Sequence, residues 1–503
     1  MTYRDKLDPG LKPSFMPNKW DKLPWVIGLG LLLRLLVVLL TERSLHPDEI
    51  IQYTEQAHRL TYGYGYVPWE YVYGIRSWLL PGAISLLLSG GRWLGLNEPS
   101  TYIPLVQIIA CLLSLSVIYC LYWLGRVLMS ESVGRIASVL AAGWYELVIR
   151  ASTLTPEVVG AYLLLAALTC LVIRPTAKTA LLLGLCGAGA VALRLQYAPA
   201  ALVVVLLGLL YVWQKRWSWR EMAIASTGFS AVVAFAGWLD HYTLDGYFVS
   251  YYNNYLYNKV YGISSLWGNE PVGYYAVMLG LYSGGVFWVT IAHSLWRKRP
   301  KPWMLLALLA AVVLPHMLIG HKEYRFIFAA VPICLLLSAL TIDDLWQVRP
   351  QSKQKNWGKL LLGLMAFYAI ATLFITSFFI EPKSPQIRAY QYLHDQPQLV
   401  SVLNLSSEWY LTGGYYYLHR DVPIYMPYHL EGIDPADWQR YISHIVCRHD
   451  QAPIVGFTPI TQLGPLDIRV ANQPPTETLA IETRYPPQGG VSNVFKPRVT
   501  PRF

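Results

Sequence analysis

The segment LPWVIGLGLLLRLLVVLL, residues 23–40, is apolar along almost its whole length, and the stretch HPDEIIQYTEQAH, residues 46–58, follows it closely. An apolar run of 18 residues is long enough to cross a bilayer as a helix. Acidic residues directly after such a run admit four interpretations: a catalytic base, a metal site, a proton relay or an ordinary helix cap. The motifs in the rest of the chain decide among these four interpretations.

The composition of the chain indicates a membrane protein. Of its 503 residues 54% are hydrophobic and only 14% are charged, and the mean hydropathy is +0.34. Soluble chains carry about 25% charged residues. The net charge of +10 comes from short basic clusters between apolar segments, which is typical of topology signals. We therefore expect membrane lipid, and not nucleic acid, around this protein.

Apolar segments of membrane-spanning length recur along the chain. One further segment, residues 79–96, contains Pro81, Gly82, Gly90, Gly91 and Arg92, so it is ambiguous. Without it, the sequence predicts a polytopic α-helical protein with about eleven transmembrane helices. The predicted spans are residues 24–41, 102–125, 133–150, 157–173, 179–194, 197–213, 221–240, 272–296, 303–320, 326–343 and 357–380.

The distribution of Lys and Arg decides how segment 79–96 is interpreted. If it does not span, each connection on the side of the N-terminus carries two or more basic residues, and the positive-inside rule places that side in the cytoplasm. We therefore expect an interfacial helix there. The prediction has a transmembrane domain at 1–380, a large first extracytoplasmic loop at 42–101, and a small extracytoplasmic α/β domain at 381–503.

The first loop holds the richest motif of the chain. Asp48 and Glu49 follow a proline, a pattern that also suits the start of a helix, where carboxylates favour the positive end of the dipole. His46 precedes this pair, and residues 50–60 are expected to form a short amphipathic helix on which Glu55 and His58 could face one another. These five residues are candidates for a site, and a simple helix cap is the alternative.

An aromatic stretch continues this loop. YGYGYVPWEYVYGIRS, residues 62–77, is rich in glycine and aromatic residues and includes Trp69, Glu70 and Arg76. Trp and Tyr combine an apolar face with a polar edge, which suits both sugar rings and the membrane interface. Trp69, Glu70 and Arg76 are therefore candidates for substrate binding.

Two further polar motifs fall on the same predicted face. RASTLTPE places Arg150 and Glu157 near the membrane boundary, where charges are costly and often functional, although a helix break with its cap would explain the segment equally well. HKEYRF contains His321, Lys322 and Arg325. Lys and Arg at a span entrance could reach for lipid headgroups, but this density of charge favours anion binding.

Together the motifs indicate a lipid-phosphate substrate. A carboxylate can deprotonate an acceptor hydroxyl, and cations can stabilise a phosphate leaving group. His46, Asp48 and His58 lack a compact metal-ligand spacing, so we expect no metal site, and nothing in the sequence calls for a cofactor.

HPDE with the downstream YGYG, WEY and IRS elements, followed far along the chain by HKEYRF, resembles glycosyltransferase family 22 over roughly residues 24–345. These are polyprenyl-phosphate-mannose-dependent mannosyltransferases of GPI-anchor and N-glycan assembly, together with bacterial relatives. The resemblance implies the GT-C fold, with a multi-span bundle and a large first outer loop. It also implies inverting transfer of a hexose, expected to be mannose, to a lipid-linked or cell-surface glycan.

The resemblance also implies roles for residues. Asp48 matches the position of the acidic residue near the acceptor, with Glu49 as its close rival. His321, Lys322 and Arg325 match the motif near the donor phosphate. We expect a multi-pass protein with its active site on the extracytoplasmic face, in a bacterial inner membrane rather than an ER membrane. A transporter or flippase of a lipid-linked glycan is the alternative function.

Overall fold

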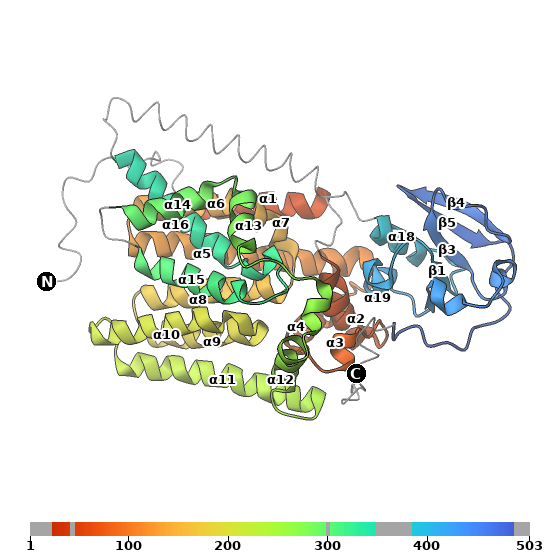
Figure 1. Cartoon of the computed structure of the whole chain (residues 1–503), viewed down its shortest axis with the longest axis horizontal. Helices are drawn as coiled ribbons and strands as arrows, with labels where there is room; N and C mark the ends of the chain where they lie inside the picture. Colours follow the sequence, from red (N-terminus) through yellow and green to blue (C-terminus); the bar gives the residue numbers. More distant parts are fainter. Residues whose placement is uncertain (1–22, 41–45, 298–301, 348–384, 487–503) are drawn as a thin grey trace.

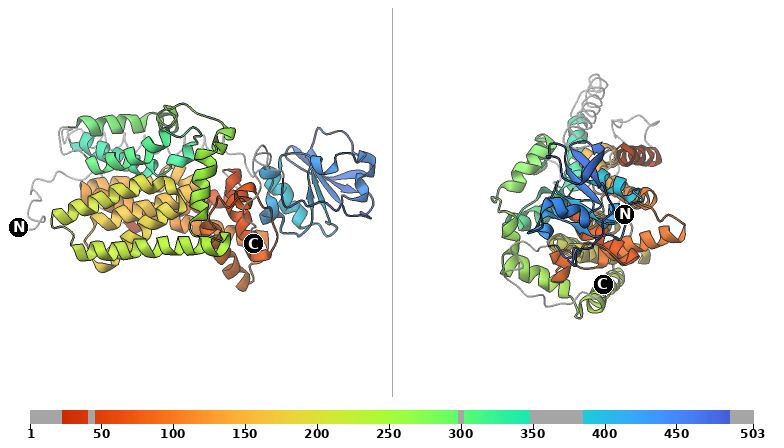
Figure 2. Two further views of the ribbon diagram at one scale, coloured as in Figure 1. Left: turned by 60° about the horizontal axis from the view of Figure 1, so that its bottom comes forward. Right: turned by 90° about the vertical axis from the view of Figure 1, so that its right-hand side faces the viewer.

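The structure is a computed structural model that describes residues 23–40, 46–297, 302–347 and 385–486. Most of these residues form a bundle of helices that lie side by side (Figure 1). A smaller domain with a β-sheet sits at one end of the bundle, and the helices of the first loop lie between the two, as both views in Figure 1 and Figure 2 agree. The first loop is therefore in contact with both parts of the molecule.

Five of the described helices are long and apolar enough to cross a membrane. They are α1 (Leu23–Leu40), α5 (Pro99–Leu128), α10 (Ala198–Trp213) with the preceding turn, α11 (Trp219–Leu244) and α16 (Ala330–Gln347). Three shorter apolar helices are α8 (Pro156–Val172), α9 (Ala177–Leu193) and α15 (Trp303–Met317).

Two further apolar segments are broken helices. The segment made of α6 (Glu131–Gly143), α7 (Tyr145–Ile149) and the turn to Ser152 bends by 54°. The segment made of α13 (Tyr274–Ser283) and α14 (Val286–Trp296) bends by 108°. The expectation of one continuous helix at 272–296 is therefore wrong.

The physical reason for the sharper bend is the pair of glycines at 284 and 285. Both have positive φ angles, 58° and 81°, a conformation that residues with a side chain rarely adopt. The first ten predicted spans each fall on one of these helices or broken pairs. The eleventh, 357–380, lies outside the described residues.

Small residues allow the helices of the bundle to pack closely. A Cβ atom on Gly184 of α9 would overlap the backbone of Ala225 on α11, so these two helices touch along their backbones. Close backbone approach through small residues is the usual way in which helices associate in a membrane. Helix α16 is central, because 83% of its apolar stretch is buried inside the protein, whereas only 11% of the apolar stretch of α1 is buried. Apolar side chains on α1, α10 and α11 face outward, as expected of a lipid-facing surface.

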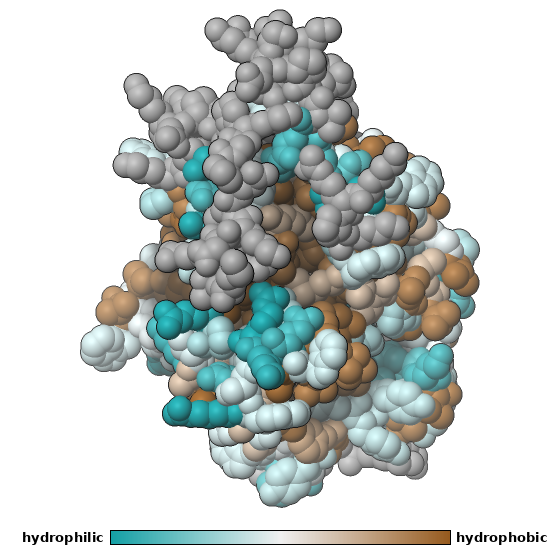
Figure 3. Space-filling model, turned by 90° about the vertical axis from the view of Figure 1, so that its left-hand side faces the viewer, coloured by the Kyte–Doolittle hydropathy of each residue, from teal (hydrophilic) through white to brown (hydrophobic). Residues whose placement is uncertain are grey.

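The end of the bundle away from the sheet domain carries hydrophilic side chains, which appear in teal in Figure 3. The connections α5–α6, α8–α9 and α10–α11 contribute exposed basic residues. They are Arg126, Arg174, Lys178, Lys215, Arg216 and Arg220. Three of the basic clusters that predict the orientation are thus exposed in the described part of the chain.

The first loop is helical. It contains the π-helical turn η2 (Glu49–Thr54), α2 (Glu55–Tyr62), α3 (Trp69–Val72) and α4 (Leu79–Trp93). Helix α4 corresponds to the segment predicted to be interfacial, and it packs against α2 and α5. A second set of short elements, α12 (Val249–Tyr255), η5 (Leu256–Val260) and η6 (Ile263–Trp267), lies at the same end of the bundle (Figure 1).

The end domain is built on a five-stranded mixed sheet of order β2-β1-β3-β5-β4. Strand β1 is parallel to β2 and β3, and β5 is antiparallel to β3 and β4. The strands are β1 (Val402–Asn404), β2 (Ile424–Tyr425), β3 (His444–Arg448), β4 (Phe457–Leu463) and β5 (Leu466–Ala471). Helices α18 (Pro385–His394) and α19 (Gly414–Leu418) complete the described part, and α19 contacts the first loop.

Candidate active site

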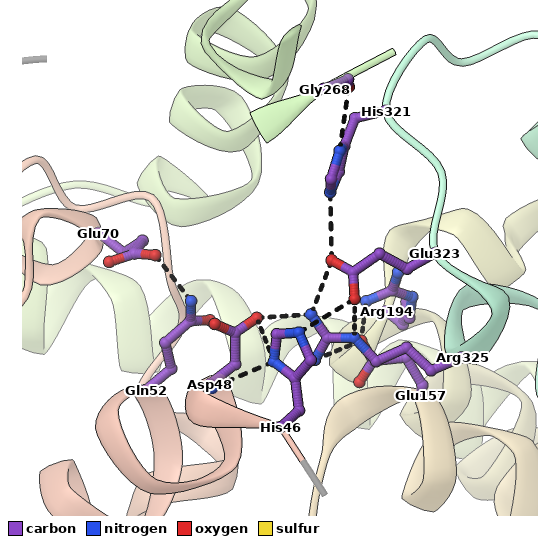
Figure 4. Close-up of polar contacts among 10 residues, drawn as sticks. All are labelled: His46, Asp48, Gln52, Glu70, Glu157, Arg194, Gly268, His321, Glu323 and Arg325. Atoms are coloured by element: carbon purple, nitrogen blue, oxygen red, sulfur yellow. Dashed lines mark hydrogen bonds and ion pairs between the residues drawn. The ribbon is translucent and has the colours of Figure 1, made fainter. Parts of the chain in front are cut away.

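Two motifs that are far apart in the sequence meet at the end of the bundle beside the first loop. Nη2 of Arg325 lies 2.6 Å from Oδ2 of Asp48, although 277 positions separate them in the chain. Asp48 immediately precedes η2, and Arg325 belongs to the short helix η7 (Tyr324–Ile327), which follows α15. The contact joins the predicted acceptor-side carboxylate to the predicted donor-side cation (Figure 4).

Glu323 is the centre of this arrangement. Its carboxylate accepts hydrogen bonds from Nε and Nη2 of Arg325 at 2.7 and 3.0 Å. It also contacts Nε2 of His46 at 3.2 Å and Nε2 of His321 at 3.1 Å. Partial burial would raise the pKa of Glu323, but the hydrogen bonds from His321, His46 and Arg325 outweigh it and hold that pKa well below its usual range. Glu323 is therefore ionised and keeps the two motifs together.

Glu157 lies behind Arg325 in the first turn of α8. Its Oε1 atom is 2.8 Å from Nη1 of Arg194 and 3.8 Å from Nη1 of Arg325. The Glu157 side chain is almost fully buried, at 3% exposure, and the Tyr197 hydroxyl donates to its backbone carbonyl. A buried carboxylate needs such partners to remain charged. We refer to His46, Asp48, Glu157, Arg194, His321, Glu323 and Arg325 as the charged cluster.

The first loop adds a second layer next to Asp48. The amide of Gln52 donates to Glu70 at 2.7 Å, and burial raises the pKa of Glu70 to about 7 despite the nearby Arg76. Burial alone would lower the pKa of Arg76, but Tyr53 and the carboxylates of Glu70, Asp48 and Glu157 raise it. The guanidinium of Arg76 is therefore a fixed positive charge in this layer.

Lys322 and His321 have backbone partners as well as their place in the motif. The Lys322 ammonium donates to the carbonyl oxygens of Glu270 at 2.6 Å and Gly320 at 3.4 Å. Nδ1 of His321 lies 3.2 Å from the carbonyl oxygen of Gly268. Its pKa is raised by the hydrogen bond to Glu323. These contacts fix the loop that carries Gly268 and Glu270 against the HKEYRF segment.

Glu55 and His58 do not join the charged cluster, and they do not pair with each other as their spacing suggested. The Glu55 carboxylate accepts from the backbone amides of Tyr66, Tyr415 and Tyr416 at 2.8, 3.1 and 2.8 Å. Nε2 of His58 lies 2.9 Å from Nδ1 of His419. Both side chains have 0% exposure.

These contacts attach the end domain to the first loop. The Tyr102 hydroxyl of α5 also donates to the Tyr416 carbonyl. Gly414 has a φ of +60°, and a Cβ atom there would lie 2.6 Å from Oε2 of Glu55, so only glycine fits. We call Glu55, His58, Tyr415, Tyr416 and His419 the docking interface. Its first two members contribute to domain docking in the structure, which their spacing alone did not indicate.

Three further predicted residues, Trp69, Arg150 and Glu49, also lie outside the charged cluster. Trp69 is 8% exposed and packs in a small apolar group with Tyr73, Tyr257 and Ile263, which connects the first loop to η5 and η6. The Arg150 guanidinium lies 5.9 Å from the centre of the Phe328 ring. Glu49 begins η2, and its carboxylate is near Tyr416.

The sequence interpretation missed three members of this region. Glu323 stood inside HKEYRF but was not selected, and Arg194 was noted only as part of a turn between spans. Gln52 stood inside the first motif. Its one signal was a polar side chain placed between Asp48 and Glu55 on a helix that is otherwise apolar. Among the described residues, no group of three or more His, Cys, Asp or Glu side chains is arranged to hold a metal ion.

The arrangement has the parts of a group-transfer site. Asp48 is a carboxylate at 27% exposure, so a substrate hydroxyl can approach it, and Arg325 offers a planar fork that matches a phosphate. The histidines and Glu323 hold both in place. The cluster lies at the end of the bundle, where the predicted spans end and the first loop begins.

Comparison with known proteins identifies the family and the relatives of this chain. A family model described as "Alg9-like mannosyltransferase family" matches residues 25–419. GPI mannosyltransferase 3 of Yarrowia lipolytica is 26% identical over 413 residues, which are 77% of this chain and 73% of that protein. GPI mannosyltransferase 3 of Drosophila melanogaster is 27% identical over 350 residues, 66% of this chain and 58% of that protein.

A solved structure shares the fold. The crystal structure of ArnT from Cupriavidus metallidurans bound to undecaprenyl phosphate superposes with a TM-score of 0.60 at 13% sequence identity. The match covers 94% of this chain and 100% of ArnT. At this identity the likeness shows the fold alone, and that fold is the GT-C type expected from the motifs.

Proposed function

The chain belongs to the Alg9-like mannosyltransferase family, and from this premise we propose the reaction that its charged cluster carries out. The enzyme moves mannose from a polyprenyl-phosphate mannose to a hydroxyl of a lipid-linked or cell-surface glycan, with inversion at the sugar carbon. The observation that supports this most is the contact of Asp48 with Arg325, because it combines a base for the acceptor with a cation for the donor phosphate.

In this proposal the donor phosphate competes with Asp48 for Arg325. When the phosphate binds the guanidinium, the Asp48 carboxylate is released and accepts the proton of the acceptor hydroxyl. The acceptor oxygen forms the new bond to C1 of the mannose, and the bond from C1 to the phosphate oxygen breaks. The polyprenyl phosphate leaves with the bonding electrons, and Arg325 stabilises its negative charge.

Glu323 is a positioning residue in this reaction. It orients Arg325 through two hydrogen bonds and holds His46 and His321 on either side. His321 and Lys322 remain candidates for the donor phosphate. Glu49 remains the rival base. Asp48 is favoured because its carboxylate contacts the guanidinium of Arg325 directly. Lys322 is 5% exposed, and its ammonium donates to the carbonyl oxygen of Glu270 beside the HKEYRF segment.

The same proposal includes the topology. Eleven spans place the N-terminus in the cytoplasm and the charged cluster on the extracytoplasmic face. The exposed basic residues on the connections at the opposite end of the bundle support this orientation. The membrane is then a bacterial inner membrane, which is the expectation stated above, or an ER membrane.

The test is a transfer assay with the purified protein in detergent. Polyprenyl-phosphate mannose with a radiolabelled sugar is supplied together with a set of glycolipid acceptors. We expect labelled product with the anomeric configuration opposite to that of the donor, measured by NMR. Arg325→Ala should abolish transfer, whereas Arg448→Ala, a change at an exposed arginine of the end domain, should not. Donor that is never consumed in detergent, but that the same protein moves across the membrane when reconstituted into vesicles, would refute the proposal and support the transporter alternative.

A further inference from the structure

The bend between α6 and α7 carries a buried carboxylate that the proposed reaction does not use. Glu146 lies in the first turn of α7, just beyond the break in the helix, and it is 3% exposed. Its Oε1 atom accepts hydrogen bonds from Nε1 of Trp144 at 3.3 Å and from the hydroxyl of Tyr324 at 3.2 Å. One carboxylate oxygen therefore joins this bend to a residue 178 positions further along the chain.

The other oxygen of the Glu146 carboxylate is unusual. Within the described residues, Oε2 is buried and has no hydrogen-bond partner. Arg150, which follows α7, attracts the carboxylate electrostatically. A buried carboxylate with incomplete pairing is less favourable than an apolar residue of the same size, and ionisable groups inside a membrane protein often serve its function. Packing alone does not explain a carboxylate at this position.

Tyr324, the distant donor, stands between two members of the charged cluster. It follows Glu323 and directly precedes Arg325 in η7, a helical turn of four residues. Short 3₁₀-helical turns have poor hydrogen-bond geometry, so their own backbone holds them weakly. The orientation of η7 therefore depends on side chains that fix it to the bundle. Tyr324, at 7% exposure, is such an anchor.

The ring of Tyr324 lies against the two broken helices. It stacks on Tyr282 at the end of α13, with ring centres 4.1 Å apart and an angle of 6° between the planes. The carbonyl of Tyr282 accepts a hydrogen bond from the Tyr145 hydroxyl of α7 at 2.7 Å. Trp144 stacks on Phe287 of α14, with ring centres 5.0 Å apart. Stacking fixes the plane of the Tyr324 ring, and the bond to the carboxylate fixes where its hydroxyl points.

We propose that Glu146 is a positioning residue for the transfer reaction. Through the Tyr324 hydroxyl it sets the orientation of η7, and thereby the direction from which the Arg325 guanidinium approaches the donor phosphate. This inference rests on the proposed function, because the role of Arg325 is assigned there. Glu146 acts through Tyr324 and is not assigned a contact with the substrate.

The contacts of Arg325 indicate how large the effect should be. The guanidinium lies 2.6 Å from Asp48 and 2.7 Å from Glu323, so a small shift of η7 changes both contacts. A displacement of about 1 Å that arises far from the chemistry can lower a rate by about 100-fold. Loss of the bond to the Tyr324 hydroxyl should therefore weaken both the binding and the departure of the donor phosphate, and it should leave acceptor binding unchanged.

Transfer kinetics of the purified full-length protein in detergent test this proposal. Tyr324→Phe removes only the hydroxyl and keeps the ring that stacks on Tyr282. We expect kcat/KM for polyprenyl-phosphate mannose to fall at least tenfold, with the donor KM raised at least threefold. The KM for the glycolipid acceptor should change by less than twofold. A merely structural loss of active enzyme would lower kcat and leave both KM values unchanged.

Variants of Glu146 give a second readout. Glu146→Leu removes the acceptor and should reproduce the losses of Tyr324→Phe. Glu146→Gln keeps an acceptor oxygen and should restore kcat/KM for the donor to within threefold of the wild type. The double variant Glu146→Leu/Tyr324→Phe should be no worse than Tyr324→Phe alone, because both changes remove the same bond. If Glu146→Leu does not yield folded protein, Tyr324→Phe and Glu146→Gln carry the test.

Trp144→Phe is the matched control. It removes the other hydrogen bond to Oε1 of Glu146 and keeps an aromatic ring against Phe287, so both KM values should change by less than twofold. If Trp144→Phe raises the donor KM as much as Tyr324→Phe does, the carboxylate only stabilises the bend, and the inference is overturned. An unchanged donor KM in Tyr324→Phe would overturn it as well.

Fluorine NMR separates this inference from the proposed function, because it needs no turnover. With 3-fluorotyrosine in place of Tyr324, inorganic phosphate should shift the resonance in the otherwise wild-type chain. The shift should be less than half as large in Glu146→Leu and absent in Arg325→Ala. A shift without any transfer of mannose would refute the proposed function and support the coupling of Tyr324 to Arg325. Transfer without a shift would overturn the inference alone, and the absence of both would overturn both.

Discussion

The two halves of HPDEIIQYTEQAH serve two different parts of the molecule. His46 and Asp48 belong to the charged cluster, whereas Glu55, seven residues after Asp48, and His58 belong to the docking interface. Both regions contain carboxylates and histidines. They differ in exposure and in the kind of partner.

In the charged cluster the partners are side chains. Asp48 and Glu323 are 27% and 26% exposed, and their cations can rotate toward a substrate. In the docking interface Glu55 has 0% exposure, and its partners are backbone amides that cannot move away. A carboxylate bound by exchangeable cations can react, whereas one bound by fixed amides holds structure. Four changes test this distinction.

The largest expected effect is that of Asp48→Asn. Loss of a general base lowers rates by roughly 10²–10⁴-fold, so kcat should fall by about that factor. The fold should survive, because Arg325 keeps its two hydrogen bonds to Glu323. Transfer kinetics and a thermal melt of the same preparation check both points. Activity within tenfold of the wild type would remove Asp48 from the reaction.

Glu55→Ala should act on stability first. The change leaves three buried backbone amides without an acceptor, which should cost about 3 kcal/mol or more. We expect the end domain to become sensitive to limited proteolysis while the rest of the bundle stays protected. Glu431→Ala, at an exposed glutamate of the same domain, is the matched control and should change neither. An intact domain in both variants would show that docking does not depend on Glu55.

The pH dependence of stability should have opposite signs in the two regions. Burial raises the pKa of Glu55 to about 7, against an ordinary value near 4.5, although three backbone hydrogen bonds oppose it. Its contribution is therefore complete below about pH 4.5 and is lost as the pH rises through 7. The pKa of Glu323 is instead lowered, so its contribution is present above about pH 4.5 and is lost in stronger acid.

Thermal melts of the wild type between pH 5 and 8 should therefore show a melting temperature that declines by a few degrees, because Glu55 and Glu70, whose pKa values are both raised to about 7, titrate there and Glu323 does not. Glu55→Gln should reduce this decline, and Glu323→Gln should leave it in place. A decline that disappears in Glu323→Gln alone would reverse the assignment.

The smallest expected effect is that of Glu49→Gln. If Asp48 is the base, removal of the neighbouring charge should lower kcat by less than about tenfold. Parallel transfer assays of Glu49→Gln and Asp48→Asn compare the two candidates directly. A greater loss in Glu49→Gln would exchange their roles.

Hydropathy and motif spacing predicted much of this molecule. The apolar segments in the described part of the chain correspond to helices or broken helices, because hydropathy follows burial in lipid or in the bundle. HPDE and HKEYRF meet because both follow a predicted span on the same face. The bend at Gly284 was missed because hydropathy does not register a backbone turn between two apolar halves.

The roles of Glu55 and Arg194 were beyond the sequence for another reason. The partners of Glu55 at Tyr415 and Tyr416 are about 360 positions away, and they are backbone amides, which every residue carries. Arg194 stands alone in its turn, and its importance follows only from the approach of Glu157. Residue type and spacing report local structure, whereas such partners are set by the tertiary fold.

The contacts from Glu55 to Tyr415 and from His58 to His419 also have a consequence for biosynthesis. During translation, α2 is complete long before α19 is made. Glu55 and His58 therefore lack their partners on and next to α19 while most of the bundle is inserted into the membrane. The first loop therefore reaches its final packing only after α19 has been made. A nascent enzyme should remain inactive until the domain that carries α19 has emerged and docked.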